Sequence, residues 1–405
     1  MRPPAFAAVL RHERFRRVWA GQAASSVGDG ITLVALPGAV LAEHSTTDLG
    51  VVLGAQSLAL VAAALVGGVL ADRFRRSRVM AAADLVRLVT AVCFALGAAG
   101  APLAVPVLLA LTTGFAAGVF TPAFAALIPD LVPAEDLPKA NALRSITVRT
   151  GQVLGPALGG LLLTAGSGGA SGGAGPAFWA DAVTFAVSAL TLAGSRDVRR
   201  PGAAGGTVLR QAREGFAAVR ERPWVLTIIV QGTLQLLLVM APVAVLLPIL
   251  LEERGEFAAY GPMVALQAGG SIVGGMVIAS WTPRSPGTVG VLGLGLLATQ
   301  VLCLLAAAPL ALLGASMAVT GFGYAVFNVT WASALHRAIP ADMLGRVFAI
   351  DTLGTYGLQP AGLALAPVAA SAFGPGPVLW VGLAALAVTT AVPLGLRQVR
   401  AFADL

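Results

Sequence analysis

Charged residues are scarce in this chain of 405 residues. They make up 11% of it, against roughly 25% in ordinary soluble domains. Hydrophobic residues make up 57%, and the mean hydropathy is +0.85. This balance excludes an ordinary soluble domain. Because the apolar runs are long and unbroken rather than short and alternating, the sequence predicts an all-α polytopic membrane protein.

Lysine and cysteine are almost absent. Lys139 is the single lysine, and Pro138 precedes it, so no GxxxxGK[ST] phosphate-binding loop exists and transport driven by ATP is not expected of this chain. There is no GxSxG string, and the three histidines are scattered near predicted span ends. We therefore expect no enzyme, no cofactor and no metal site. Cys93 and Cys303 fall inside predicted spans and are expected to act as small apolar residues.

Apolar stretches of membrane-spanning length recur along the chain. They predict twelve transmembrane helices joined by short connections rich in glycine, proline or charge. The predicted spans are 18–41, 50–71, 79–99, 103–128, 140–165, 177–194, 224–251, 260–281, 288–307, 309–334, 346–371 and 376–396.

The basic residues alternate between the two sides of this arrangement. One side holds 22 of the 26, whereas the other side holds Arg254 alone among loops that carry acids. By the positive-inside rule, both termini are predicted to be cytoplasmic. The basic excess is thus assigned to topology, and no nucleic-acid partner is expected. Arginine in place of lysine is typical of a GC-rich bacterial genome, so we expect a multi-pass protein of the bacterial inner membrane.

An internal repeat links residues 207 positions apart. Thr113–Phe115 recurs as Thr320–Phe322, and Gly67-Gly68 recurs as Gly274-Gly275. A constant offset across several spans predicts two parallel six-helix repeats, with a substrate site where the halves meet.

A basic connection divides the chain near its middle. We predict an N-terminal half over 1–194, a linker over 195–222 and a C-terminal half over 223–405. Within the linker, Leu209, Ala212, Phe216 and Val219 recur at helical spacing. The pattern fits a helix on the inner membrane face or a solvated linker helix equally well.

Residues 68–78 read GVLADRFRRSR, between the second and third spans. An acid followed by four arginines can pair internally or reach a neighbouring helix end; the plainer alternative is anchoring by arginines. The string resembles the signature loop of the major facilitator superfamily, which implies the major facilitator fold. It also implies a gating loop whose acid latches near Leu344–Arg346. The matching positions are Gly68, Leu70, Ala71, Asp72, Arg73 and Arg76, whereas Arg75 stands where the family prefers glycine.

Residues 151–160 read GQVLGPALGG in the fifth span. Glycines four apart let a facing helix approach closely, and proline bends the helix; we expect Gly270 and Gly274 of the eighth span to face this row. Ordinary small-residue packing is the alternative. The row resembles the motif of exporters in the superfamily, carried by Gly151, Gly155, Pro156, Gly159 and Gly160. The strings FRRVW, FTPAF and FWADAVTF resemble the macrolide-efflux and enterobactin-exporter branch, which implies export of a small organic compound, usually with inward proton flow.

Asp29 lies about eleven residues into the first span. An ionisable group inside the bilayer is costly and indicates function, here proton binding, although a structural acid paired with an arginine is the alternative. Arg149 and Asp351 are the other candidates for proton coupling. Asp84 and Arg87, three residues apart, are expected to pair structurally, and Asp181 is expected to be structural.

Polar and aromatic residues within the spans are candidates for cargo contacts in a mostly apolar cavity. They are Gln22, Gln56, Gln152, Gln231, Gln235, Gln267, Asn328, Trp331, Tyr356 and Gln359.

Together these features predict a secondary transporter that exports a small lipophilic or amphipathic compound (a drug, antibiotic or siderophore-like molecule) by alternating access, in antiport with protons. A nutrient importer or facilitator, or a non-transporting membrane receptor or immunity protein, is the alternative. The expected partners are the small-molecule substrate, protons and the lipid bilayer, and the expected state is a monomer.

Overall fold

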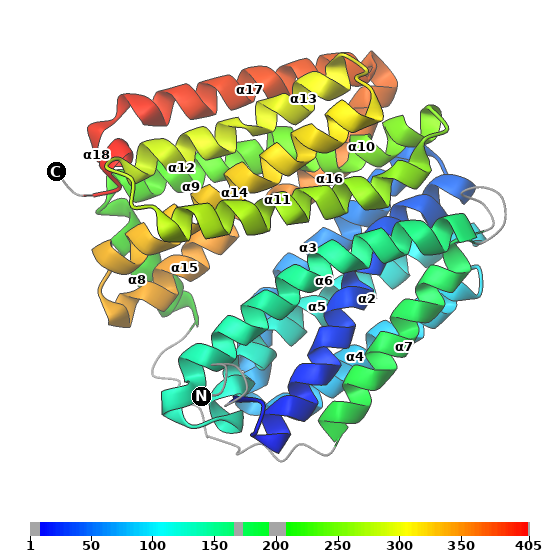
Figure 1. Ribbon diagram of the computed structural model, residues 1–405, viewed down its shortest axis with the longest axis horizontal. Coiled ribbons are helices and arrows are strands. Elements are labelled where there is room, and N and C mark those ends of the chain that lie inside the picture. Colours follow the sequence, from blue (N-terminus) through cyan, green and yellow to red (C-terminus); the bar gives the residue numbers. More distant parts are fainter. Residues whose placement is uncertain (1–8, 166–172, 194–207, 404–405) are drawn as a thin grey trace. The chain divides into compact units, whose positions relative to one another are not determined.

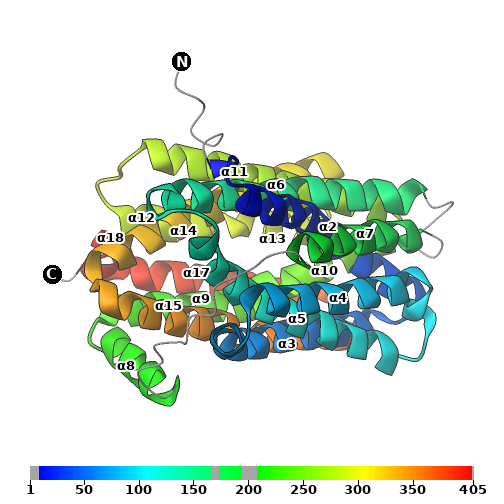
Figure 2. The same ribbon diagram turned by 90° about the horizontal axis from the view of Figure 1, so that it is seen from below.

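The computed structural model describes residues 9–165, 173–193 and 208–403, and all regular structure within them is helical (Figures 1 and 2). The chain divides into two compact units. Unit 1 comprises Met1–Ala203 and Leu251–Ala265, and unit 2 comprises Ala204–Leu250 and Leu266–Leu405. The division near the middle agrees with the predicted linker, but Leu251–Ala265 belongs with unit 1 and not, as expected, with the C-terminal half.

Unit 1 is a bundle of six long helices. α2 packs against α6 and α7, α3 packs against α5, and α4 packs against α5 and α7. A core of apolar side chains, among them Phe15, Met80 and Leu127, lies between them. The helices are α2 (Glu13–Glu43), α3 (Thr46–Arg73), α4 (Arg76–Ala95), α5 (Ala104–Leu131), α6 (Leu137–Ala165) and α7 (Ala174–Ala193), with short 3-10 turns η1 (Ala98–Gly100), η2 (Ala134–Asp136) and η4 (Phe257–Ala259).

Unit 2 is built from helices that are more often interrupted. The predicted seventh span passes through a π-helical turn, and the eleventh breaks at Gly357-Leu358, just before Pro360. The elements are α8 (Val208–Arg220), α9 (Pro223–Gln235), η3 (Leu236–Met240), α10 (Ala241–Glu253), α11 (Tyr260–Ser280), α12 (Pro286–Gly295), α13 (Leu297–Leu305), α14 (Leu310–Ala338), α15 (Ala341–Tyr356), α16 (Gln359–Phe373), α17 (Pro375–Gly395) and α18 (Arg397–Ala401); α10 and α11 extend across the boundary between the units.

All twelve predicted spans are helical where the structure describes them. Nine helical stretches within that part of the chain are long and apolar enough to cross a membrane. The prediction of a polytopic all-α protein is therefore confirmed, while twelve crossings and cytoplasmic termini stay predictions.

Helix ends follow the predicted repeat. α3 ends at Arg73 and α11 at Ser280, and α5 ends at Leu131 and α14 at Ala338; both pairs of ends are 207 residues apart. Pro133 and Pro340, also 207 apart, start the element after each. Proline disfavours helix in the residue before it, so the duplicated proline accounts for the duplicated helix end.

The predicted linker helix exists as α8, and one of its faces packs on unit 2 (Figure 1). Ala218 and Val219 are buried among residues of α9 and α15, while Phe216 is 53% exposed. The Arg346 Nη1 atom lies 2.9 Å from Glu214 Oε2, which ties α8 to the start of α15. Leu209 and Ala212 have side chains outside the described residues.

Candidate transport site

Asp29 lies in α2 between two glycines that serve different contacts. A Cβ atom on Gly28 would collide with the side chains of Thr184 and Asp181 in α7, and one on Gly30 would lie 2.7 Å from the carbonyl oxygen of Gly151 in α6. α2 is therefore held closely on two sides. The Asp29 side chain, 51% exposed, projects between these contacts.

The partner of Asp29 is Arg87 of α4. Nη2 of Arg87 contacts Oδ1 of Asp29, whereas Nη1 lies 3.8 Å from Oδ1 of Asp84 on its own helix. The guanidinium is 5% exposed and stacks on the Phe185 ring at 4.0 Å. The expected Asp84–Arg87 pair is thus the longer of two contacts, because one turn of α4 presents both residues to α2 and α7. The sequence did not indicate that Arg87 would reach the first span.

Two further carboxylates surround this arginine. Asp84 is fully buried, and its Oδ2 atom accepts a hydrogen bond of 2.6 Å from Ser188, which in turn accepts one of 3.0 Å from Gln22. Asp181 of α7 is 2% exposed and accepts a hydrogen bond of 2.5 Å from Thr32; it lines the same small cavity as Arg87. Asp29, Asp84, Arg87 and Asp181 are called the acid cluster below.

The acid cluster has too little positive charge. One guanidinium can neutralise one carboxylate, and an unpaired buried carboxylate costs several kcal/mol. Asp84 Oδ1 has no hydrogen-bond partner among the residues that the structure describes. The cluster is therefore best satisfied when a buried carboxyl carries a proton, which is the chemistry of a proton-binding site.

A cavity of about 370 Å³ opens beside Asp29 within unit 1. It has aromatic walls from α2 and α5 and a row of residues from α6. The lining residues are Trp19, Gln22, Ser26, Asp29, Gly30, Leu33, Phe120, Thr121, Phe124, Arg144, Thr147, Val148 and Gln152.

Arg144, and not Arg149, lines this cavity. Residues 144, 148 and 152 share one face of α6, while 149 lies about 140° around the helix from 144. Arg149 is exposed and does not line the cavity. Depth in the span favoured Arg149 in the sequence; helical phase, read from Gln152 backwards, would have pointed to Arg144.

The glycine row of α6 packs mainly on α2. A Cβ atom on Gly155 would lie 2.5 Å from Cα of Gly30, and one on Gly151 would lie 2.6 Å from the carbonyl oxygen of Ser26. Gly159 faces Ile31 in the same way, and Pro156 is buried beside Gly30. The first span is thus the principal partner of the row.

The expected partners Gly270 and Gly274 were wrong. Both pack on α14, at Ala318 and Phe322. One contact with α11 does exist: a Cβ atom on Gly160 would lie 3.2 Å from Cα of Gly261. Glycine spacing alone could not distinguish among the several glycine-rich helices that compete for the row.

The gating loop is described in part. Arg73 ends α3, but the side chains of Gly68 and Asp72 lie outside the described residues. Arg76 donates hydrogen bonds to Asp130 Oδ2 at 2.8 Å and to the Ala126 carbonyl oxygen at 2.9 Å, which joins the start of α4 to the end of α5.

A second, smaller cavity lies in unit 2, with a volume of about 70 Å³. Asp351 accepts a hydrogen bond of 3.1 Å from the Trp331 indole, and the Tyr324 and Tyr356 hydroxyls lie 2.9 Å apart. Of the predicted cargo residues, Gln235, Asn328, Trp331 and Tyr356 line it. Tyr324 was missed because it looked like one more apolar-face residue of its helix.

The remaining predicted cargo residues are dispersed. Gln22 and Gln152 line the 370 Å³ cavity, and Gln56 lines the small cavity beside Arg87. Gln231 is buried, with no hydrogen-bond partner for its amide among the described residues. Gln231, Gln267 and Gln359 line none of these three cavities.

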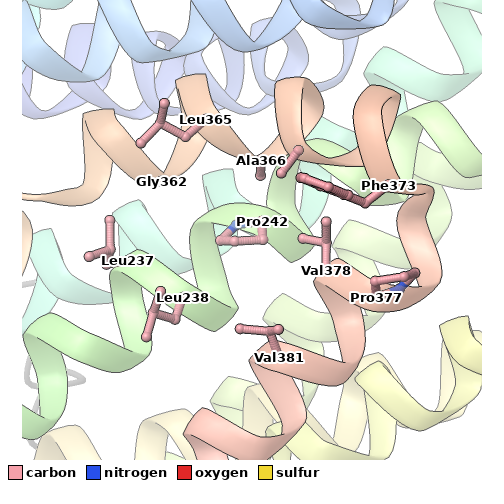
Figure 3. A pocket seen from close by; sticks show the side chains of 11 residues that line it. Leu237, Leu238, Pro242, Gly362, Leu365, Ala366, Phe373, Pro377, Val378 and Val381 are labelled. Atoms are coloured by element: carbon pink, nitrogen blue, oxygen red, sulfur yellow. The ribbon is translucent and has the colours of Figure 1, made fainter.

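An apolar groove of about 450 Å³ lies between η3, α10, α16 and α17 (Figure 3). Leu237, Val381 and Phe373 are among the side chains that border it, and every lining residue is apolar or glycine. It offers no charged or polar side chain to orient a polar cargo, so the cavity of unit 1 is the better candidate site.

Comparison with known proteins identifies the family. The Major Facilitator Superfamily model matches residues 18–358, so the chain belongs to that superfamily and is a transporter, not an enzyme. The enterobactin exporter EntS of Escherichia coli O1:K1 / APEC is 30% identical over 386 residues, covering 90% of this chain and 89% of the relative. EntS of Shigella boydii serotype 18 is 37% identical over 161 residues, 38% of each chain.

Solved structures agree on the fold. A variant of the nucleoside transporter NupG superposes with a TM-score of 0.74 at 14% identity, covering 94% of this chain and 99% of the other. A D-xylose-proton symporter gives 0.70 at 16% identity, covering 98% of each chain. At such identities the likeness shows the fold alone.

Proposed function

We propose that this chain exports a small lipophilic or amphipathic organic compound across the bacterial inner membrane, by alternating access and in exchange for protons. The observation that carries the proposal is the acid cluster, in which three carboxylates share one arginine beside a cavity. The glycine row of α6 supports export. The EntS relatives favour a siderophore-like molecule as cargo.

The acid cluster suggests how a proton would act. While Asp29 is ionised it holds Arg87, and through Arg87 it ties α2 to α4. A proton bound at Asp29 removes that charge, so Arg87 is free to move toward Asp84 on its own helix. The tie between α2 and α4 is then lost, which couples protonation to helix movement.

Transport into inverted membrane vesicles tests the proposal. Vesicles with the parent protein are expected to accumulate lipophilic dyes when their lumen is acidified, and to stop when the pH gradient is collapsed. Asp29→Asn should lower gradient-driven accumulation at least about tenfold, the loss of roughly 1.4 kcal/mol of coupling. It should still exchange dye for dye, since exchange needs no net proton movement.

Two outcomes decide against the proposal. Accumulation that persists without a pH gradient contradicts proton coupling. Dye movement that is the same in vesicles with and without the protein contradicts export, and binding without movement supports the receptor alternative.

A further inference from the structure

The polar groups that line the 370 Å³ cavity of unit 1 are mostly used by the protein itself. The Trp19 indole donates to Thr147 Oγ1 at 2.8 Å, and Thr147 donates to the Leu143 carbonyl oxygen. Gln22 donates to Ser188, and Ser26 donates to the Gln22 carbonyl oxygen. Thr121 is likewise bonded to its own helix. These groups shape the wall and have little capacity left for cargo.

Two side chains are different. Arg144 and Gln152, both on α6, have no hydrogen-bond or ion-pair partner in the part of the chain that the structure describes. The Arg144 guanidinium lies over the Phe124 ring, 5.0 Å from its centroid, which orients it without using its N–H donors. Eight residues of helix place the two Cα atoms about 12 Å apart along α6.

The charge of the cavity wall is therefore positive. Asp29 is the other charged residue that lines it, and Arg87 already neutralises Asp29. Arg144 remains uncompensated in a partly buried, aromatic environment, where a charge without a counter-ion is costly. A planar guanidinium with free donors fits a carboxylate, phenolate or sulfonate.

We propose that Arg144 binds an anionic group of the cargo, so that the transported compounds are aromatic or otherwise apolar anions with a second polar group about 12 Å away, near Gln152. Trp19, Phe120 and Phe124 supply the surface for the apolar body. This inference rests on the proposed function, because it assigns the class of cargo.

A matched pair of probes tests it. 8-Anilinonaphthalene-1-sulfonate and N-phenyl-1-naphthylamine share one aromatic body and differ by the sulfonate. Binding of each to the purified full-length protein in detergent is measured by fluorescence titration, with protein-free micelles subtracted. The parent is expected to bind the sulfonate at least about tenfold more tightly than the neutral probe, as a charge-assisted contact gives.

Variants on α6 assign the preference to one residue. Arg144→Gln should abolish the tenfold difference and leave the neutral probe within twofold, while Arg144→Lys should restore part of it. Lys139→Gln removes a positive charge from the same helix outside the cavity and should leave the ratio of the two affinities unchanged. Thermal melting of each variant verifies that it is folded.

The outcomes separate the two proposals. Equal affinities for both probes in the parent, tighter binding of a cation such as ethidium, or an unchanged ratio in Arg144→Gln overturns the anion site. Arg144-dependent binding of the sulfonate without gradient-driven accumulation in inverted vesicles supports the site and overturns the proposed function instead.

Discussion

At the scale of single residues, the position of Arg87 governs unit 1. It is buried and contacts or approaches carboxylates on α2 and α4, so its removal leaves Asp84 buried without a cation. We expect Arg87→Gln to lower the stability of the protein by about 3–5 kcal/mol and Asp29→Asn by about 1 kcal/mol or less, because Asp29 is half exposed. Melting in detergent measures both.

The double variant Arg87→Gln/Asp84→Asn controls this prediction. It removes the uncompensated carboxylate together with the arginine, so it should melt at a higher temperature than Arg87→Gln alone. A double variant no more stable than the single one would mean that the cost comes from lost stacking on Phe185 and not from charge.

Asp136 offers a pH-dependent contact outside the spans. Hydrogen bonds from Lys139 Nζ at 2.7 Å and His12 Nε2 at 3.1 Å lower the pKa of the Asp136 carboxyl below its usual range. A lowered folded-state pKa contributes stability above the unfolded value of about 3.9, and that stability is lost as pH falls through the folded value. The difference in melting temperature between the parent and Asp136→Asn should therefore shrink from about pH 6 to about pH 3. Glu135→Gln, an exposed neighbour, should show no such narrowing.

At the scale of elements, contacts between helices are duplicated along with the sequence. Gly155 packs on Gly30, and 207 residues later Gly362 packs on Leu237. The pair formed by α3 and α5 is also repeated by α11 and α14, but in a changed register. Gly67 faces Val119, whereas its counterpart Gly274 faces Phe322 and not Val326, a difference of four residues or about 6 Å. The repeat could predict which helices pair, but not this slide, because either register brings a glycine against backbone.

The α2–α6 contact gives a sharp prediction. Gly155→Ala would place a Cβ atom 2.5 Å from Cα of Gly30 and from the carbonyl oxygen of Val27. Backbone cannot yield as a side chain can, so the helices must separate, at a cost of about 1–3 kcal/mol. We expect a lower melting temperature and slower transport.

Gly376→Ala is the matched control, since open space surrounds that position. It should behave like the parent in both measurements. A Gly155→Ala protein that melts with the parent would show that the close approach of α2 and α6 is not needed for stability.

At the scale of the whole molecule, composition and periodicity predicted the helical spans well, and the repeat predicted their pairing. The candidate site was harder. Asp29 was found because a charge in an apolar span is conspicuous. Its partner Arg87 was not, since contact between the first and third spans depends on how α7 packs with both. Arg144 was passed over for Arg149 because depth was weighed before helical phase.

Topology is the remaining expectation at this scale, and labelling can decide it. The charge bias predicts an even number of crossings with both termini inside. In a background carrying Cys93→Ala and Cys303→Ala, single cysteines are introduced by Glu253→Cys, Thr282→Cys and Leu396→Cys, all at exposed positions. A membrane-impermeant maleimide should label the first in intact bacterial spheroplasts and the other two only after permeabilisation. Labelling of the Leu396→Cys protein in intact cells would place the C-terminus outside and break the twelve-span arrangement. Because Thr282 and Leu396 follow the predicted eighth and twelfth spans, equal protection of both also tests whether the broken helices α12–α13 and α15–α16 each cross the membrane once.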